Sequence, residues 1–183
     1  MRIIAGALKG RRLKPPTWDG LRPTSDKLRE TLFNILAPRM AGARVLDGYS
    51  GTGALGIEAI SRGAARVTFV DNDRRAQALI ADNLARCGVE GGYAIIRASV
   101  AVAIDDLGAT PVEPFDIILL DPPYDDPQVD AVVAAAGDVL APDGVLVLEH
   151  ARRRAVPDAA GRLTRVRQVT SGDSTLSFYS CPP

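Results

Sequence analysis

An aspartate-proline-proline-tyrosine run, Asp121-Pro122-Pro123-Tyr124, follows the apolar segment 115–120. The exocyclic amino group of a nucleobase is a poor nucleophile because its lone pair is delocalised into the ring, so it needs acceptors that hold its two hydrogens out of the ring plane. The Asp121 carboxylate and the Pro122 carbonyl can accept these hydrogens, and Tyr124 can stack on the base. The prolines also stiffen the backbone, as in a loop that carries no chemistry. The run favours group transfer to an amine, with a rigid loop as the alternative.

Residues 47–56 form a second candidate site because they combine an aspartate with closely spaced glycines. Gly51, Gly53 and Gly56 spell the G-x-G-x-x-G pattern of dinucleotide sites, and Asp71 lies twenty residues after Gly51, where an acid can bind ribose hydroxyls. The Asp47 carboxylate would repel a pyrophosphate, whereas S-adenosylmethionine has no phosphate and carries an ammonium group and a sulfonium. The turn therefore favours S-adenosylmethionine, and a turn that serves only strand–helix packing is the alternative. We expect cofactor contacts from Asp47, Tyr49, Ser50, Gly51, Gly53, Asp71 and Asn72.

The elements that must position these residues alternate between short apolar runs and helical patterns. The runs lie at 43–47, 67–71, 93–96, 115–121 and 145–149, and the helical patterns near 53–62, 73–87, 99–107 and 127–140. This succession predicts a parallel α/β sheet, in which the carboxyl ends of the strands share one crevice. Segments 163–170 and 175–180 alternate like an antiparallel hairpin at the sheet edge. A small hairpin before Pro15 and a helix over 25–37 precede the sheet.

Charge is divided unevenly along the 183 residues, although 22 Lys and Arg balance 22 Asp and Glu. Residues 1–44 carry ten basic and three acidic side chains, and the remainder carries 12 basic and 19 acidic ones. Cationic side chains that neutralise phosphates are the main sequence-independent source of affinity for nucleic acids. The first quarter therefore indicates a segment that faces a polyanion, and a solvated basic surface is the alternative.

Composition excludes several classes of function. The apolar runs are far shorter than the roughly 20 residues of a membrane span, and charged residues at 9, 11 and 12 interrupt any secretory signal. We therefore expect a cytoplasmic protein. Cys87 and Cys181 form no C-x-x-C pair and His150 is the single histidine, so we expect no metal site and no hydrolase triad. Trp18, Glu58 and His150 are expected to be packing or surface residues.

The chain resembles class I methyltransferases with a D/N-P-P-Y motif, and among them the bacterial 16S rRNA guanine-N2 methyltransferases of the RsmD type. The resemblance spans essentially the whole chain. The segments that carry it are Arg2-Ile-Ile-Ala-Gly6, Lys9-Gly-Arg11, Arg22-Pro-Thr-Ser-Asp26, Arg29-Glu30, Phe33-Asn34, Gly53-Ala-Leu-Gly56, Glu58-Ala59, Ser61-Arg-Gly-Ala64, Asp71, Asp121 to Tyr124, and Gly172-Asp173-Ser174-Thr175-Leu176 with Phe178.

The resemblance implies a Rossmann-like, seven-stranded, mostly parallel sheet with helices on both faces. It implies a basic extension over 1–40 and a methyltransferase core over 41–183 within one compact unit. S-adenosylmethionine would be the methyl donor, and N2 of guanine 966 in 16S rRNA the acceptor, in assembled or assembling small subunits. We expect a monomer. Asp121, Pro122, Pro123 and Tyr124 would be catalytic, and Lys9, Arg11, Arg12, Arg22, Thr24 and Arg29 would face RNA.

Two positions depart from the family pattern. Gly48 replaces an apolar residue before the glycine turn, and Ser99 stands where an acid commonly meets the adenine amino group. A hydroxyl accepts a weaker hydrogen bond than a carboxylate, so we expect weaker cofactor binding rather than altered chemistry. Methylation of adenine N6 in DNA is the alternative activity, although only about 40 residues lie outside the core to read base edges. A non-catalytic RNA-binding assembly factor is the alternative outside enzymes.

Overall fold

A computed structural model of the chain describes residues 1–18, 25–111 and 113–182. In these residues the strands are β1 (Arg44–Gly48), β2 (Arg66–Asp71), β3 (Tyr93–Arg97), β4 (Phe115–Leu120), β5 (Leu140–Ala151), β6 (Ala159–Ala160), β7 (Leu163–Ser171) and β8 (Ser174–Ser180). The α-helices are α1 (Asp26–Met40), α2 (Ala54–Ser61), α3 (Arg74–Arg86), α4 (Val100–Ala109) and α5 (Val129–Ala136), and the short 3₁₀ helix η1 covers Gly137–Val139. The predicted alternation of strands and helices is confirmed.

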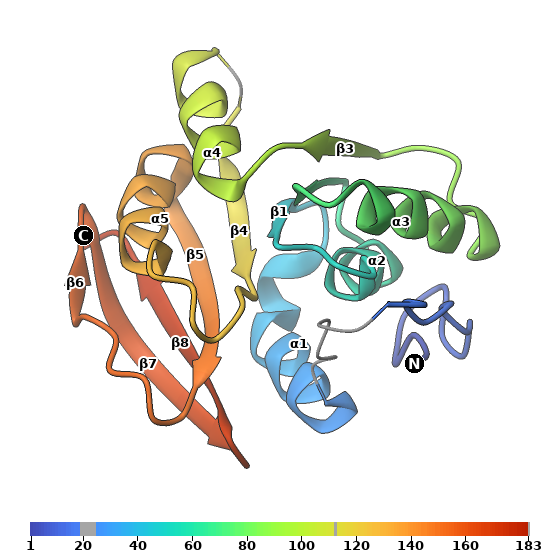
Figure 1. Cartoon of the computed structure of the whole chain (residues 1–183), viewed down its shortest axis with the longest axis horizontal. Helices are drawn as coiled ribbons and strands as arrows, with labels where there is room; N and C mark the ends of the chain where they lie inside the picture. Colours follow the sequence, from blue (N-terminus) through green and yellow to red (C-terminus); the bar gives the residue numbers. More distant parts are fainter. Residues whose placement is uncertain (19–24, 112, 183) are drawn as a thin grey trace.

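The strands of the described chain form one sheet in the order β3-β2-β1-β4-β5-β8-β7-β6 (Figure 1). Strands β1 to β5 pair in parallel, and β8 pairs antiparallel with both β5 and β7. The Rossmann-like class and the edge hairpin are confirmed, but the sheet has eight strands rather than the expected seven. The additional strand is β6, whose two residues pair with the start of β7 and are too few to leave a pattern in the sequence.

Two apolar layers cover the faces of this sheet. One contains buried side chains of α1, α2 and α3, such as Leu32, Ile57 and Ile80, packed against Phe69 and Ile117. The other contains buried side chains from α4 and α5 packed against the opposite face of β1, β4 and β5. Near-continuous apolar runs in β1 and β4 follow from this double coverage, since both faces of a central parallel strand are buried.

The N-terminal segment forms a small hairpin that lies against the helical layer. Arg2 and Arg12 form an antiparallel bridge, and Ile3 and Leu13 are buried in the same apolar layer as α1. Ser25 caps α1 by accepting a hydrogen bond from the Leu28 amide at 3.2 Å. The expected hairpin and the expected helix near 25–37 are thus confirmed, with the helix three residues longer at its carboxyl end. Among the described residues no helix is long and apolar enough to cross a membrane.

Candidate active site

A cleft of about 760 Å³ opens at the carboxyl ends of the parallel strands. The ladder pairs Asp47 of β1 with Phe69 of β2 and with Leu119 of β4, so the ends of these three strands lie side by side. Of the residues predicted to bind cofactor or act in catalysis, the cleft is lined by Asp47, Tyr49, Ser50, Gly51, Asp71, Asn72, Asp121, Pro122, Pro123 and Tyr124. The structure therefore brings both predicted motifs into one cleft.

The turn between β1 and α2 needs glycine for two separate reasons. Gly51 and Gly53 have φ angles of 54° and 77°, a left-handed conformation that glycine adopts without strain. Gly53 does not line the cleft and instead occupies the N-cap position of α2. A Cβ atom at Gly56 would lie 2.2 Å from Phe69 Cε1 and 2.9 Å from Asp47 Oδ2, so α2 packs against β2 only without that side chain. Tyr49 has a φ of 60°, which is strained for a residue with a side chain.

Asp47 is a buried carboxyl group, 1% exposed, at the floor of the cleft. Its Oδ2 atom accepts a hydrogen bond from the Gly56 amide at 2.8 Å. The pKa of Asp47 is raised to about 8, chiefly by burial and to a smaller extent by the nearby charge of Asp71, while the hydrogen bond from the Gly56 amide limits the increase. A cation in the cleft beside Asp47 would stabilise the charged form, since the carboxylate otherwise has one amide donor to compensate for its burial.

Ser50 and Asp71 fasten the glycine turn to β2. Ser50 Oγ accepts a hydrogen bond from the Val70 amide at 2.9 Å, and the Ser50 amide donates to the Val70 carbonyl at 3.1 Å. Asp71 Oδ2 accepts from the Gly51 amide at 2.9 Å, and its Oδ1 accepts from the Asp73 amide at 2.9 Å. Hydrogen bonds of Ser50 and Gly51 thus fix the turn to the end of β2, and the Asp71 carboxylate lies at the wall of the cleft.

The Asp121-Pro122-Pro123-Tyr124 run leaves β4 next to the glycine turn. The Asp121 amide donates to the Gly48 carbonyl at 3.4 Å, which ties the start of the run to the end of β1. At the other end the Tyr124 hydroxyl lies 2.6 Å from Oγ of Ser174, the first residue of β8. Residues 171–174, where β7 turns into β8, also line the cleft, so the edge hairpin forms one of its walls.

A smaller cavity of about 290 Å³ adjoins the cleft between the ends of β2 and β4. Tyr49, Asp71, Asn72, Ser99 and Pro123 are among the residues that line it. Ser99 caps α4 by accepting a hydrogen bond from the Val102 amide at 3.3 Å, so its hydroxyl is already engaged with the protein backbone.

The departure at Gly48 also has a local explanation in packing. A Cβ atom at Gly48 would lie 2.7 Å from Leu120 Cδ2 and 3.2 Å from Val100 Cγ1. These two side chains fill the space that an apolar residue at position 48 would occupy. The departure from the family pattern therefore leaves no hole beside the glycine turn.

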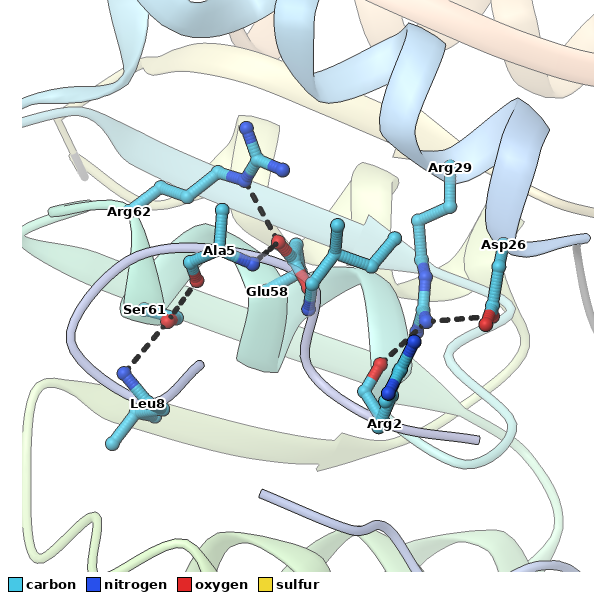
Figure 2. A network of polar contacts seen from close by, with 9 residues as sticks. Arg2, Ala5, Leu8, Asp26, Arg29, Glu58, Ser61 and Arg62 are labelled. Atoms are coloured by element: carbon cyan, nitrogen blue, oxygen red, sulfur yellow. Dashed lines mark hydrogen bonds and ion pairs between the residues drawn. The ribbon is translucent and has the colours of Figure 1, made fainter. Parts of the chain in front are cut away.

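The residues predicted to face RNA do not all lie at the cleft. Lys9, Arg11 and Arg12 are exposed on the N-terminal hairpin and do not line it. Arg22 and Thr24 lie outside the described residues. Arg29 is fully buried, and its Nη2 donates to the Arg2 carbonyl at 2.6 Å and to Asp26 Oδ1 at 3.0 Å (Figure 2). Arg29 thus anchors the N-terminal segment to α1 and also lines the cleft, and its Nε and Nη1 atoms have no hydrogen-bond partner among the described residues.

Glu58 is expected from the sequence to be a packing or surface residue, but in the structure it anchors the N-terminal segment. Its buried carboxylate accepts hydrogen bonds from the amides of Ile4 at 2.8 Å and Ala5 at 3.0 Å, and from Arg62 Nε at 2.8 Å. Ser61 Oγ donates to the Ala5 carbonyl at 2.5 Å and accepts from the Leu8 amide at 2.9 Å (Figure 2). Two polar residues one helical turn apart in α2 therefore hold the N-terminal segment.

Asn83 connects the same segment to the glycine turn. Its Oδ1 accepts from the Lys14 amide at 2.7 Å, and its Nδ2 donates to the Thr52 carbonyl at 3.0 Å. Asn83 is fully buried, and a buried amide is favourable only where its donors and acceptor are used. A polar residue inside an apolar helix face is the signal that sequence reasoning could have used, although it does not identify the partners.

The fold and the two motifs at its cleft are those of a class I methyltransferase. Residues 1–180 match the family model "Conserved hypothetical protein 95". The chain is 34% identical to ribosomal RNA small subunit methyltransferase D of Escherichia coli K12, over 98% of this chain and 89% of that protein. It is 35% identical to "Putative rRNA methyltransferase YlbH" of Bacillus subtilis, over 98% of each chain. The chain belongs to this family, the RsmD family.

Solved structures agree with this assignment. "Putative methyltransferase yhhF" from Escherichia coli superposes with a TM-score of 0.84 at 33% identity, covering 99% of this chain and 97% of that one. A more distant structure, "SMU.776, a putative methyltransferase complexed with SAH", has a TM-score of 0.73 at 18% identity, over 88% of this chain and 51% of that one. The second likeness supports the fold alone.

Proposed function

We propose that the protein transfers a methyl group from S-adenosylmethionine to N2 of a guanine in 16S rRNA, conventionally guanine 966. The observation that carries the proposal is the position of the Asp121-Pro122-Pro123-Tyr124 run, which enters the same cleft as the Asp47 carboxyl group and the glycine turn. One part of the cleft offers acceptors for an amine, and the other offers a buried acid for a cationic cofactor. The rRNA methyltransferases among its relatives favour an RNA substrate.

The chemistry of the cleft fits S-adenosylmethionine. Asp47 can bind an ammonium group, and the backbone at Gly51 allows close approach of a ligand because no side chain intervenes. Asp71 offers a carboxylate to the ribose hydroxyls, while Tyr49 and Asn72 line the adjoining cavity with it. When bound, the cofactor supplies a methyl group activated by its positive sulfur.

The reaction that we propose needs orientation more than a strong base. The Asp121 carboxylate and the Pro122 carbonyl accept the two hydrogens of the amino group, and the nitrogen lone pair is thereby directed at the methyl carbon. With the cofactor held by Asp47 and Asp71, its methyl carbon would bond to this nitrogen as its bond to sulfur breaks, and the electron pair of that bond would stay on sulfur. The nitrogen becomes cationic and then loses one proton, for which the Asp121 carboxylate is the nearest base in the run. Tyr124 holds the base by stacking.

Methyl-labelled S-adenosylmethionine and the purified protein provide the test. Small ribosomal subunits that lack the modification, naked 16S rRNA and duplex DNA are the separate substrates, and the labelled nucleoside is identified after digestion. Labelled N2-methylguanosine from a ribosomal substrate supports the proposal. Label in N6-methyladenine of DNA refutes the substrate, and RNA binding without any label refutes catalysis in favour of an assembly factor.

The variant Asp121→Asn probes the assigned role. The asparagine oxygen still accepts one hydrogen bond but carries no charge, so we expect turnover to fall by roughly a hundredfold, the order of magnitude found when one preorganised polar group is removed from a catalytic site. Binding of S-adenosylhomocysteine, measured by calorimetry, should remain within about twofold because Asp47 and Asp71 are unchanged. Full activity in this variant would contradict the role of the carboxylate.

The setting of the reaction forms part of the same proposal. We place the protein in the cytoplasm as a monomer that acts on assembled or assembling small subunits. Residues 1–40 would serve mainly to bind RNA, and residues 41–183 would bind the cofactor and carry out the transfer. The exposed positions of Lys9, Arg11 and Arg12 support a role in RNA binding for the first segment.

A further inference from the structure

A second cluster of cationic residues lies at the other end of the chain. Residues 152–167 contain six arginines and one aspartate, within a body that is acidic overall. The ion pairs in this stretch join Arg154 to Asp130 and Arg165 to Asp158. Arg152, Arg153, Arg162 and Arg167 are exposed, and none of them has an ion pair with a carboxylate of the described residues. Positive charge without an ion-pair partner is thus concentrated in the segment that follows β5 and along β7, toward one edge of the sheet.

Contacts connect this edge to the catalytic run. Ala151, the last residue of β5, pairs with Ser174, and the Arg152 amide donates to the Asp173 carbonyl at 2.7 Å. Ser174 Oγ in turn lies 2.6 Å from the Tyr124 hydroxyl. Arg152 and Arg153 therefore lie next to the β7–β8 turn, which forms a wall of the cleft.

Arg167 extends the charge along the neighbouring strand. It lies in β7 opposite Phe178 of β8, with its guanidinium carbon 6.0 Å from the centre of the Phe178 ring. This cation–π contact places the guanidinium group over the ring, while the residue stays exposed to solvent. We name Arg152, Arg153 and Arg167 together the arginine edge.

The arginine edge and the basic N-terminal hairpin lie on opposite sides of the molecule, with β7 and β8 on the left of Figure 1 and the N-terminus on the right. The cleft opens at the strand ends between them. A folded RNA that presents one base to the cleft extends beyond it in both directions, and its phosphates need cationic partners on both sides.

We propose that the arginine edge is a second RNA-binding surface, which holds the phosphate backbone on the side of the cleft opposite the N-terminal hairpin. This inference rests on the proposed function for its RNA substrate. Guanidinium groups suit phosphates because their planar arrangement of donors matches two oxygens at once. Charges on an edge strand also prevent strands of different molecules from pairing, and a role limited to that protection is the competing explanation.

The test uses the variant Arg152→Gln/Arg153→Gln/Arg167→Gln and the control Arg66→Gln/Arg86→Gln. The control residues are exposed, do not line the cleft, and lie at the amino end of β2 and at the carboxyl end of α3. Affinity for an unmodified 16S rRNA transcript is measured between 50 and 300 mM salt. The slope of log affinity against log salt falls by about 0.7 to 0.9 for each phosphate that the protein no longer neutralises, so we expect a decrease of about 2 and roughly tenfold weaker binding at moderate salt. In the control, the decrease in the salt slope and the loss of affinity should each be less than half of those in the triple variant.

Two further measurements make the result specific. Binding of S-adenosylhomocysteine must remain unchanged in the triple variant, which shows that the fold and cofactor site are intact. With unmethylated small subunits as substrate, KM for the subunit should rise several-fold while kcat stays within about twofold. An unchanged salt slope, or a slope changed equally in the control, overturns the inference, as does aggregation of the variant with normal RNA affinity. Because RNA binding is measured without methyl transfer, an inactive wild-type protein refutes the proposed function and not this surface.

Discussion

Asp47→Asn would remove the ionisable carboxyl group from the cleft while it keeps an oxygen for the Gly56 amide. Burial raises the pKa of Asp47 to about 8, so the cofactor-free protein holds a neutral carboxylic acid here at pH 6 to 7. An ammonium group binds to the ionised form. Cofactor binding should therefore release a proton from Asp47, and the affinity should depend on pH.

The size of this effect follows from the pKa. With a pKa of about 8, roughly 1% of the carboxyl is ionised at pH 6 and roughly 9% at pH 7. The α-amino group of the ligand stays mostly charged over this range, since such groups titrate near 7.7 to 8.0. Affinity should thus rise by about eightfold to tenfold between pH 6 and pH 7, which corresponds to about 1.3 kcal/mol. In Asp47→Asn the same interval should leave the affinity almost constant and well below that of the wild type at pH 7.

Calorimetric titration with S-adenosylhomocysteine in buffers of different ionisation enthalpy measures both the affinity and the protons released. The wild type should release close to one proton at pH 6.5, and Asp47→Asn close to none. A pH-independent affinity in the wild type, or an equal slope in the variant, would show that Asp47 is charged before the cofactor binds or does not meet the ammonium group. Either result would refute this account of the buried acid.

The raised pKa of Asp47 makes cofactor affinity increase with pH, whereas it makes the stability of the cofactor-free protein decrease with pH. Between pH 3.8 and about 8 the folded state keeps a proton on Asp47 that the unfolded state has lost, so the free energy of unfolding falls as pH rises through this window. From pH 6 to pH 9 the wild type should lose roughly 3 kcal/mol relative to Asp47→Asn. In thermal melts without cofactor, the variant should gain several degrees on the wild type as the pH is raised.

Two substitutions at α2 test the packing around the cleft. Gly56→Ala should destabilise the protein by about 1 to 3 kcal/mol in urea denaturation, although alanine favours helices, because its Cβ would lie 2.2 Å from the Phe69 ring. A stability equal to that of the wild type would mean that α2 can shift away from β2 at no cost. Glu58→Gln should cost about 3 kcal/mol because it leaves the Arg62 charge and the backbone amides with a weaker partner. Hydrogen exchange at the N-terminal segment should accelerate in this variant more than in β4, and uniform acceleration would argue against a local anchor.

Local patterns were sufficient to predict the parallel strands and both motifs. Asp47, Asp71 and Asp121 come at or directly after the ends of strands, and the parallel sheet brings their backbone positions to one edge. Such placement needs only the strand boundaries and the rule that parallel strands end together. The cleft that these residues share is a direct consequence of the alternation in the sequence.

Contacts between distant segments could not be predicted in this way. Glu58 accepts a hydrogen bond from the amide of Ile4, which lies 54 residues earlier in the sequence. The position of Glu58 in a short helix gives no indication of that partner. Arg29 shares a basic stretch with exposed residues but is buried, because the N-terminal hairpin folds over the start of α1. A charge pattern shows where cationic residues occur in sequence, whereas their exposure depends on what packs over them.

The docking of the N-terminal hairpin also sets an order of events during synthesis. The amides of residues 4, 5, 8 and 14 bind to Glu58, Ser61 and Asn83, all of which are made later. At roughly 5 to 20 residues per second, the first segment waits several seconds after its own translation before its last partner exists. During that interval its cationic residues are tethered to the translating ribosome without a docking site. A nascent chain that stops before α3 would already carry Glu58 and Ser61 but would lack Asn83, so Lys14 and the Thr52 carbonyl are joined only when α3 folds.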